Sequence, residues 1–219
     1  MYSQNNEDDL IYSYFKNNYP ERWENRTTDG NRFTLLEVGA NDGKTFSNSL
    51  KLIQEGFQAV LVEPSPRAFK LLKKLHGKNE DIILHNFGFA LFNGTQTFFE
   101  SGGYMDGDDV ALYSSLDEEE IKRWNDTVKF TEVEADFRTW VDFRNEQKGE
   151  IYDFISIDCE GFDLTLLKQM NLTELGCKCL IIEWNGIEQV RTEIKEYCAQ
   201  FGLVEYHSNM ENLILIKQI

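Results

Sequence analysis

The chain has few basic residues and no stretch long enough to cross a membrane. It carries 22 Lys and Arg against 38 Asp and Glu, which gives a formal net charge of −16 over 219 residues. An average surface of this sign repels the phosphates of a nucleic acid, so we expect no nucleic-acid partner. No apolar run approaches the about 18 residues of a membrane span, so we expect no membrane anchor or membrane partner.

The cysteines lack the spacing of a redox or zinc motif. Cys159, Cys177, Cys179 and Cys198 form no C-x-x-C pair, and we expect them to be reduced thiols. Residues 1–9 are polar and acidic, unlike an export signal. We therefore expect a cytoplasmic protein; no sequence feature indicates its oligomeric state.

What the chain does have is enough apolar material for one core. Hydrophobic residues make up 41% of it, and chains of about 200–250 residues commonly form one α/β domain. We expect a single domain over residues 1–219, in which residues 1–32 form a leading helix and a linker. An insertion or lid expected at residues 93–135 interrupts it, with strands at 95–100 and 127–134 around a Gly- and Asp-rich stretch.

Helical and strand patterns alternate through the rest of the chain, which predicts βαβ units and a parallel sheet. The expected strands are 33–38, 58–63, 82–87, 152–157 and 178–182. The expected helices are 5–18, 46–55, 66–76, 137–146, 163–170 and one that carries Val190, Ile194, Tyr197, Cys198 and Phe201 on one face.

The last two expected strands, 203–207 and 212–217, are separated by only four residues. A parallel crossover needs a dozen or more residues, so this pair must form an antiparallel hairpin. The predicted fold is therefore α/β and Rossmann-like: a mostly parallel seven-stranded sheet with a terminal antiparallel hairpin and a small inserted β segment. This topology is typical of class I methyltransferases, whereas dinucleotide-binding domains usually keep all their strands parallel.

The first expected strand runs into a small-residue loop with the sequence EVGANDG. Its small residues allow a ligand to approach the backbone closely. The loop has two glycines, Gly39 and Gly43, and lacks the third glycine of the pyrophosphate-binding fingerprint. The carboxylate of Glu37 would repel a pyrophosphate but pair with a cationic amino group. We therefore predict S-adenosylmethionine as the cofactor, bound by the loop residues Glu37, Gly39, Ala40, Asn41, Asp42 and Gly43.

Two later segments add candidates for cofactor binding. Glu63 and Pro64 follow an apolar strand about 25 residues after the glycine loop, where an acid can accept hydrogen bonds from ribose hydroxyls. Nicotinamide enzymes use the same device, so Glu63 alone does not choose between the cofactors. Phe89 and Ala90 lie where backbone and aromatic groups can enclose an adenine ring.

Carboxylates follow the two most apolar strands. Asp158 and Glu160 leave a strand whose surroundings would desolvate them, and they point to the same side if that strand persists, which makes them candidate general bases. Asp158, Glu183 and Asn185 offer the oxygen ligands that Mg²⁺ prefers. Catechol-type O-methyltransferases have a similar placement of such ligands, so we include a magnesium site as an expectation.

Taken in order, six blocks of the chain resemble the FkbM-type methyltransferase family. They are SQNNED at 3–8, EVGANDG at 37–43 with Ser47 and Asn48 after it, VEP at 62–64, SSL at 114–116, IDCEG at 157–161, and Asn212. The resemblance implies a Rossmann-like fold, S-adenosylmethionine as methyl donor, and O-methylation of a small-molecule or carbohydrate hydroxyl. It also places Asp158 and Glu160 near the transferred methyl group, and Gln4, Glu7 and Asp8 over the site.

The expected function is a direct in-line methyl transfer to a small-molecule or glycan acceptor, assisted by a carboxylate or a metal. Two alternatives remain open. A nicotinamide-dependent oxidoreductase is disfavoured by the loop spacing and the terminal hairpin. A non-catalytic cofactor-binding module would bind the cofactor without transferring a methyl group.

Overall fold

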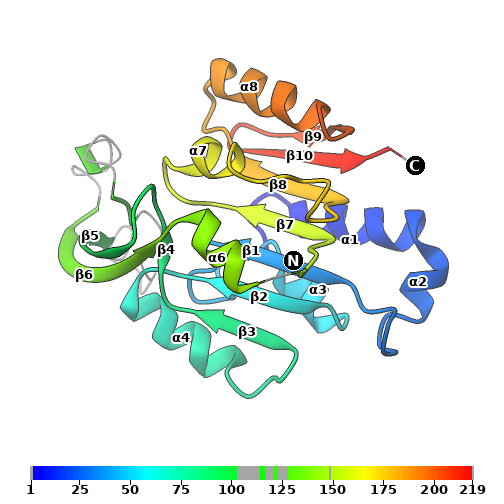
Figure 1. The fold of residues 1–219 in the computed structure, drawn as a ribbon, viewed down its shortest axis with the longest axis horizontal. Helices are drawn as coiled ribbons and strands as arrows, with labels where there is room; N and C mark the ends of the chain where they lie inside the picture. Colours follow the sequence, from blue (N-terminus) through cyan, green and yellow to red (C-terminus); the bar gives the residue numbers. More distant parts are fainter. Residues whose placement is uncertain (1, 103–113, 117–120, 123–127, 148, 219) are drawn as a thin grey trace.

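A seven-stranded sheet forms the centre of the molecule (Figure 1). The computed structural model describes residues 2–102, 114–116, 121–122, 128–147 and 149–218. The strand order is β3-β2-β1-β7-β8-β10-β9. The strands are β1 (Thr34–Val38), β2 (Gln58–Val62), β3 (Ile82–His85), β7 (Phe154–Ile157), β8 (Cys179–Glu183), β9 (Leu203–Ser208) and β10 (Asn212–Lys217).

The sheet confirms the predicted mixture of directions. Strands β3, β2, β1, β7 and β8 are parallel to one another, whereas β10 runs antiparallel to both β8 and β9. The carboxyl ends of β1, β2, β7 and β8 therefore share one edge of the sheet. Ligands bind at this edge in open α/β sheets, where strand order reverses between neighbours such as β1 and β7.

Helices cover both faces of the sheet because side chains along each strand alternate between two cores. Leu36 and Val38 pack with helices α6, α7 and α8, whereas Leu35 packs with α1, α2, α3 and α4. The helices are α1 (Glu7–Asn18), α2 (Pro20–Glu24), α3 (Leu50–Gln54), α4 (Pro66–His76), α6 (Trp140–Glu146), α7 (Asp163–Leu167) and α8 (Glu188–Ala199).

Two helix predictions need correction near the amino terminus. Residues 20–24 lie in the expected linker, yet they form α2, which begins at Pro20 because the first helical position needs no backbone N–H donor. The helix expected at 46–55 begins only at Leu50. Phe46 has a φ of +54°, and the Ser47 hydroxyl accepts a hydrogen bond from the Leu50 amide (3.0 Å), so residues 46–49 form a turn instead.

The inserted β segment is confirmed as a separate three-stranded sheet. Its strands β4 (Gly88–Phe89), β5 (Gly94–Ser101) and β6 (Phe130–Arg138) lie in the order β4-β6-β5, with β5 antiparallel to β6. The Gly- and Asp-rich stretch that suggested a lid lies, apart from Gly102, outside the described residues.

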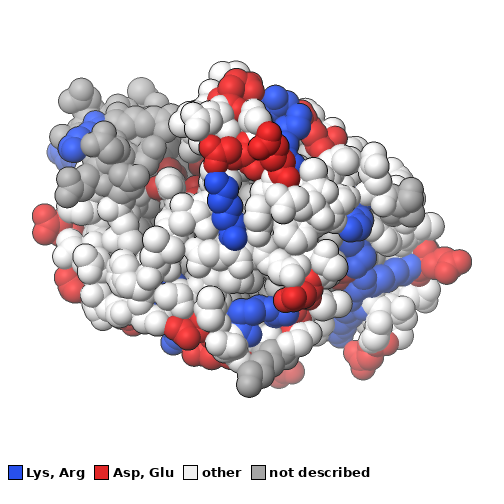
Figure 2. Space-filling model, turned by 45° about the horizontal axis from the view of Figure 1, so that its top comes forward, with Lys and Arg blue, Asp and Glu red and all other residues white. Residues whose placement is uncertain are grey.

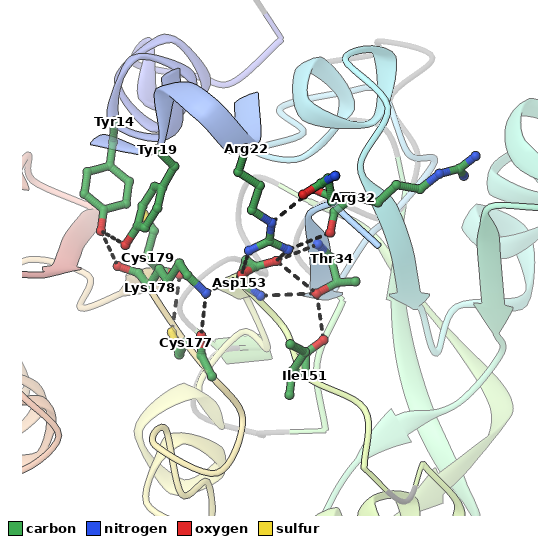
Figure 3. A network of polar contacts seen from close by, with 12 residues as sticks. Tyr14, Tyr19, Arg22, Arg32, Thr34, Ile151, Asp153, Cys177, Lys178 and Cys179 are labelled. Carbon is green, nitrogen blue, oxygen red and sulfur yellow. Dashed lines mark hydrogen bonds and ion pairs between the residues drawn. The ribbon is translucent and has the colours of Figure 1, made fainter. Parts of the chain in front are cut away.

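At the opposite edge, where β7 and β8 begin, a buried carboxylate joins four elements (Figure 3). Asp153 is fully buried and accepts two hydrogen bonds from the Arg22 guanidinium, each 2.8 Å long. It also accepts one from the Thr34 amide (3.0 Å) and forms an ion pair with Lys178. This network fixes α2 against β1, β7 and β8. It lies at the opposite end of these strands from the motif residues.

Candidate functional site

A cavity of about 700 Å³ opens at the carboxyl ends of β1, β2, β7 and β8. Most of the site residues predicted from the sequence come together in its wall. The predicted residues that line it are Glu37, Gly39, Ala40, Asn41, Glu63, Pro64, Phe89, Ala90, Asp158, Glu160, Glu183 and Asn185.

Asp42 and Gly43 are the two predicted cofactor residues outside this lining. The Asp42 carboxylate accepts hydrogen bonds from the amides of Lys44 (2.8 Å) and Thr45 (2.7 Å), which closes the loop on itself. Gly43 faces α4, where an added Cβ would lie 2.6 Å from a methyl group of Leu72. Both residues therefore shape the loop that carries Gly39, Ala40 and Asn41.

Glu37 lies near the end of β1, inside the cavity wall. It is 4% exposed, and its carboxyl group accepts a hydrogen bond from the Ser49 hydroxyl. Burial raises the pKa of Glu37 to about 7, although the bond from Ser49 opposes this shift. A cationic ligand in the cavity would favour the ionised form of this group.

Glu63, just after β2, holds the glycine loop in place. One carboxylate oxygen accepts a hydrogen bond from the Asn41 amide (2.8 Å), and the other accepts one from the Ser65 amide (2.7 Å). Burial raises the pKa of Glu63 to about 7 in spite of these two bonds. Glu63, the residue predicted to bind the ribose, therefore also connects the loops that follow β1 and β2.

Phe89 and Ala90 form the wall on the side of the inserted sheet. Phe89 packs against Phe87, Trp140 and Phe143, with ring centroids 5.3–5.6 Å apart. Both residues are at most 5% exposed, yet both reach the cavity surface. They provide an apolar wall of the kind that adenine rings pack against.

The turn after β7 differs from the prediction for Asp158 and Glu160. The strand ends at Ile157, and Glu160 has a φ of +46°, so strand alternation does not place the two carboxyls on one side. Both nevertheless line the cavity. Burial and the neighbouring Glu160 charge raise the pKa of Asp158 well above its ordinary value. Within the described chain, no residue donates a hydrogen bond to the Asp158 carboxyl group.

Glu183 and Asn185 lie at the end of β8. The Asn185 amide donates a hydrogen bond to Glu183 (3.0 Å), and burial, followed by the charge of Asp158, raises the pKa of Glu183. Among the described residues, no group of three or more His, Cys, Asp or Glu side chains has an arrangement that could hold a metal. The structure thus gives the predicted magnesium site no support.

Within the described residues, the charged groups that line the cavity are all of one sign. Six acidic residues line it, and no Lys, Arg or His stands among the described lining residues. On the face shown in Figure 2, by contrast, basic and acidic side chains are interspersed. The acidic lining is formed by Glu37, Glu63, Asp158, Glu160, Glu183 and Glu211.

The amino terminus and the last hairpin complete the wall. Gln4, which the family resemblance placed over the site, lines the cavity and donates a hydrogen bond to Glu211 (3.2 Å). Glu7 lies behind it, fully buried, and accepts hydrogen bonds from the side chains of Asn209 (2.7 Å) and Asn212 (3.1 Å). The leading segment is thereby held to the β9–β10 turn.

Glu211 also lines the cavity, although it was not predicted as a site residue. A signal existed, because an antiparallel strand beside β8 must begin where β8 ends, and Asn212 does pair with Glu183. Asp8 does not line the cavity; its carboxylate instead accepts a hydrogen bond from the Ser3 hydroxyl (2.7 Å) at the start of α1.

Comparison with solved structures gives only distant similarity. A hypothetical protein from Thermus thermophilus is 14% identical, with 99% of this chain and 87% of that one covered and a TM-score of 0.48. Fibrillarin from Aeropyrum pernix, solved with natively bound S-adenosyl-L-methionine, is 8% identical, with 84% and 66% covered and a TM-score of 0.44. A putative RNA methyltransferase from Pyrococcus horikoshii is 10% identical, with 93% and 85% covered and a TM-score of 0.44.

A family model identifies the chain, whereas no curated protein matches it. No helix within the described residues is both long and apolar enough to span a membrane. The model of the methyltransferase FkbM domain matches residues 37–214, which include the β1 loop, the turn after β7 and the first half of the last strand. The chain therefore belongs to the FkbM methyltransferase domain family.

Proposed function

We propose that this protein transfers a methyl group from S-adenosylmethionine to a hydroxyl group of a small molecule or carbohydrate. One observation carries the proposal: the cavity at the strand ends is lined by six carboxyl groups and, among the described residues, by no cationic side chain. S-adenosylmethionine carries a positive sulfonium and a positive amino group, which complement such a lining. A nicotinamide dinucleotide would bring two phosphates into the same negative field.

Several cavity residues suit the cofactor. Glu37 offers a buried carboxyl group for the amino group of the methionine part, and Glu63 offers one for the ribose hydroxyls. The side-chain oxygen of Asn41 is buried, and no described residue donates a hydrogen bond to it, so a hydrogen-bond donor on the ligand would satisfy it. Phe89 and Ala90 offer the apolar wall for adenine.

Asp158 is our candidate for the general base. It lines the cavity, and burial, followed by the charge of Glu160, raises its pKa above that of an ordinary aspartate, which makes its carboxylate a stronger base. When bound, S-adenosylmethionine supplies an electrophilic methyl group on a positively charged sulfur. Transfer would form a C–O bond to the acceptor and break the S–C bond, whose electron pair would remain on sulfur. Asp158 would take up the hydroxyl proton, with Glu160 as the second candidate.

The charge of the lining also bears on the acceptor. An acceptor with a phosphate would enter a cavity that already holds several carboxyl groups, at a cost that grows as the site excludes water. We therefore propose an acceptor without phosphate, such as a neutral glycan or another hydroxyl-bearing small molecule. Nucleic acids do not fit this description.

Cofactor binding provides the first test. Thermal unfolding is measured with millimolar S-adenosylmethionine or NAD, since a ligand at 100 times its Kd stabilises a protein by about 2.7 kcal/mol. We expect a shift with S-adenosylmethionine alone. If S-adenosylmethionine causes no shift in thermal unfolding, the proposed function is wrong.

Transfer provides the second test. Methyl-labelled cofactor is incubated with neutral sugars, phosphorylated sugars and hydroxylated aromatics. We expect label in a phosphate-free hydroxyl compound and a large loss of transfer in Asp158→Asn, with Glu174→Gln, an exposed carboxylate elsewhere, as the matched control. Cofactor binding without transfer to any acceptor would favour the non-catalytic module instead.

A further inference from the structure

The turn after β7 is fixed by a carboxylate that does not line the cavity. Asp163, at the start of α7, is 5% exposed. One of its oxygens accepts a hydrogen bond from the Cys159 amide (2.8 Å), and the other accepts one from the Gly161 amide (3.2 Å). These two amides flank Glu160, so Asp163 closes the loop that follows Asp158.

A second contact reaches the same turn from the inserted sheet. The Ser115 hydroxyl donates a hydrogen bond to the main-chain carbonyl of Glu160 (2.8 Å). Ser115 is itself attached to β5, because its amide and carbonyl both pair with Phe99 (3.1 Å each). The inserted segment thereby supports the turn that carries the candidate base.

The turn needs such support for two physical reasons. Glu160 has a φ of +46°, a left-handed conformation that non-glycine residues adopt only when their surroundings hold them there. Asp158 and Glu160 also repel each other, and no described residue donates a hydrogen bond to the Asp158 carboxyl group. Asp163 and Ser115 provide hydrogen bonds that hold the turn in this conformation.

We propose that Asp163 and Ser115 are positioning residues, which together hold the Asp158 carboxyl group toward the sulfonium of the bound cofactor. The inference rests on the proposed function. It also assigns a role to the inserted segment that differs from the expected lid: its Ser115 supports the site from behind. Asp158 is the group that acts on the ligand, and the other two act through it.

The test compares the binding of two ligands by calorimetry. S-adenosylmethionine and S-adenosylhomocysteine differ by one methyl group and the positive charge on sulfur, so the ratio of their Kd values reports the charge that faces the sulfur. Asp158→Asn should weaken S-adenosylmethionine about tenfold relative to S-adenosylhomocysteine. Ser115→Ala and Asp163→Asn should shift the ratio in the same direction by at least about threefold.

Two controls separate positioning from a general loss of structure. Ser115→Thr keeps the hydroxyl and should keep the native ratio. Thr97→Val removes a hydroxyl of the same inserted sheet, bonded to Glu134 (3.3 Å) outside the cavity, and should leave the ratio unchanged. In the double variant with Asp158→Asn, the Ser115→Ala substitution should cause no further shift, because its effect passes through Asp158.

Two results would overturn the inference: an unchanged ratio of the two Kd values in the variants, whether or not both ligands bind more weakly, and full additivity with Asp158→Asn. If Asp163→Asn does not fold, Ser115→Ala carries the test alone, because it removes only one hydroxyl group. Failure of the native protein to bind either ligand would overturn the proposed function as well. Native binding with an unchanged ratio in the variants would overturn the positioning role alone.

Discussion

Gly39 lies so close to Asp158 that no side chain fits between them. A Cβ atom on Gly39 would lie 1.8 Å from the main-chain oxygen of Asp158, and Gly39 has a φ of +80°. The Asp158 amide also donates a hydrogen bond to the carbonyl of Val38 (3.1 Å). The loop that we propose binds the cofactor and the turn that we propose carries the base are thus packed as one unit.

Gly39→Ala should therefore damage both stability and cofactor binding. The left-handed φ costs an alanine roughly 1–2 kcal/mol, and the overlap with Asp158 forces the two strand ends apart in addition. We expect a loss of more than about 2 kcal/mol in the free energy of unfolding, measured with urea, and at least a tenfold weaker Kd for S-adenosylmethionine.

Gly30→Ala is the matched control for this substitution. Gly30 has a φ of +84°, but nothing lies within 4 Å of an added Cβ. It should show only the conformational cost and leave cofactor binding unchanged. Equal effects of the two substitutions would contradict the steric explanation.

The stability of the cofactor-free protein should fall as pH rises. Burial raises the pKa of Glu37 and Glu63 from 4.5 to about 7, so the folded chain holds protons that the unfolded chain has released. Their contribution to stability is fully present below pH 4.5 and is lost as pH rises through about 7. Urea unfolding at about pH 5.5 and about pH 8 measures this.

Substitution of one carboxyl group measures how much that group contributes to the pH dependence of stability. Glu63→Gln should reduce the difference between the two pH values, whereas Glu174→Gln, at an exposed position, should retain it. Binding of S-adenosylmethionine should strengthen as pH rises over the same range, because the carboxyl groups ionise and then attract a cation. The same pH dependence in native protein and Glu63→Gln would show that Glu63 does not titrate in this range.

Asp153→Asn should destabilise the fold without affecting the cavity. It leaves Arg22 and Lys178 facing an uncharged group, although their side chains, 26% and 24% exposed, can still reach water. We expect a loss of about 2–4 kcal/mol in the free energy of unfolding, with the Kd for S-adenosylmethionine unchanged in the folded protein.

An exposed ion pair serves as the comparison. Asp81 pairs with Arg32 but has a side chain that is 42% exposed, so Asp81→Asn should cost less than about 1 kcal/mol. If Asp153→Asn costs no more than Asp81→Asn, the buried network does not stabilise the sheet.

Glu7→Ala should loosen the leading segment from the terminal hairpin. It removes the carboxylate that accepts hydrogen bonds from Asn209 and Asn212. We expect faster amide hydrogen exchange in residues 2–8 and 208–212, with exchange in β1 and β7 unchanged. Glu24→Ala, an exposed position on α2, should leave both segments protected. Unchanged exchange in Glu7→Ala would show that other contacts hold the segment.

Much of the site could be predicted because its residues follow strands that are easy to recognise. Apolar runs mark β1, β2, β7 and β8, and carboxyl groups such as Glu37 and Glu183 stand at their ends, which meet at one edge of a parallel sheet. The roles of Asp163 and Ser115 could not be predicted in this way. Each acts through a hydrogen bond to another loop, and no local pattern indicates which loop that is.

The sequence by itself determined the order of the strands in the main sheet, the terminal hairpin, the family and the acidic character of the site, because periodicity, loop length and motif spacing are local properties. Only the tertiary structure decided that the β7 turn leaves the strand at Ile157 and that Gly39 packs against Asp158. It also decided that Glu211 lines the cavity beside Gln4. These features depend on contacts between residues far apart in the chain, whose partners the folded backbone alone brings together.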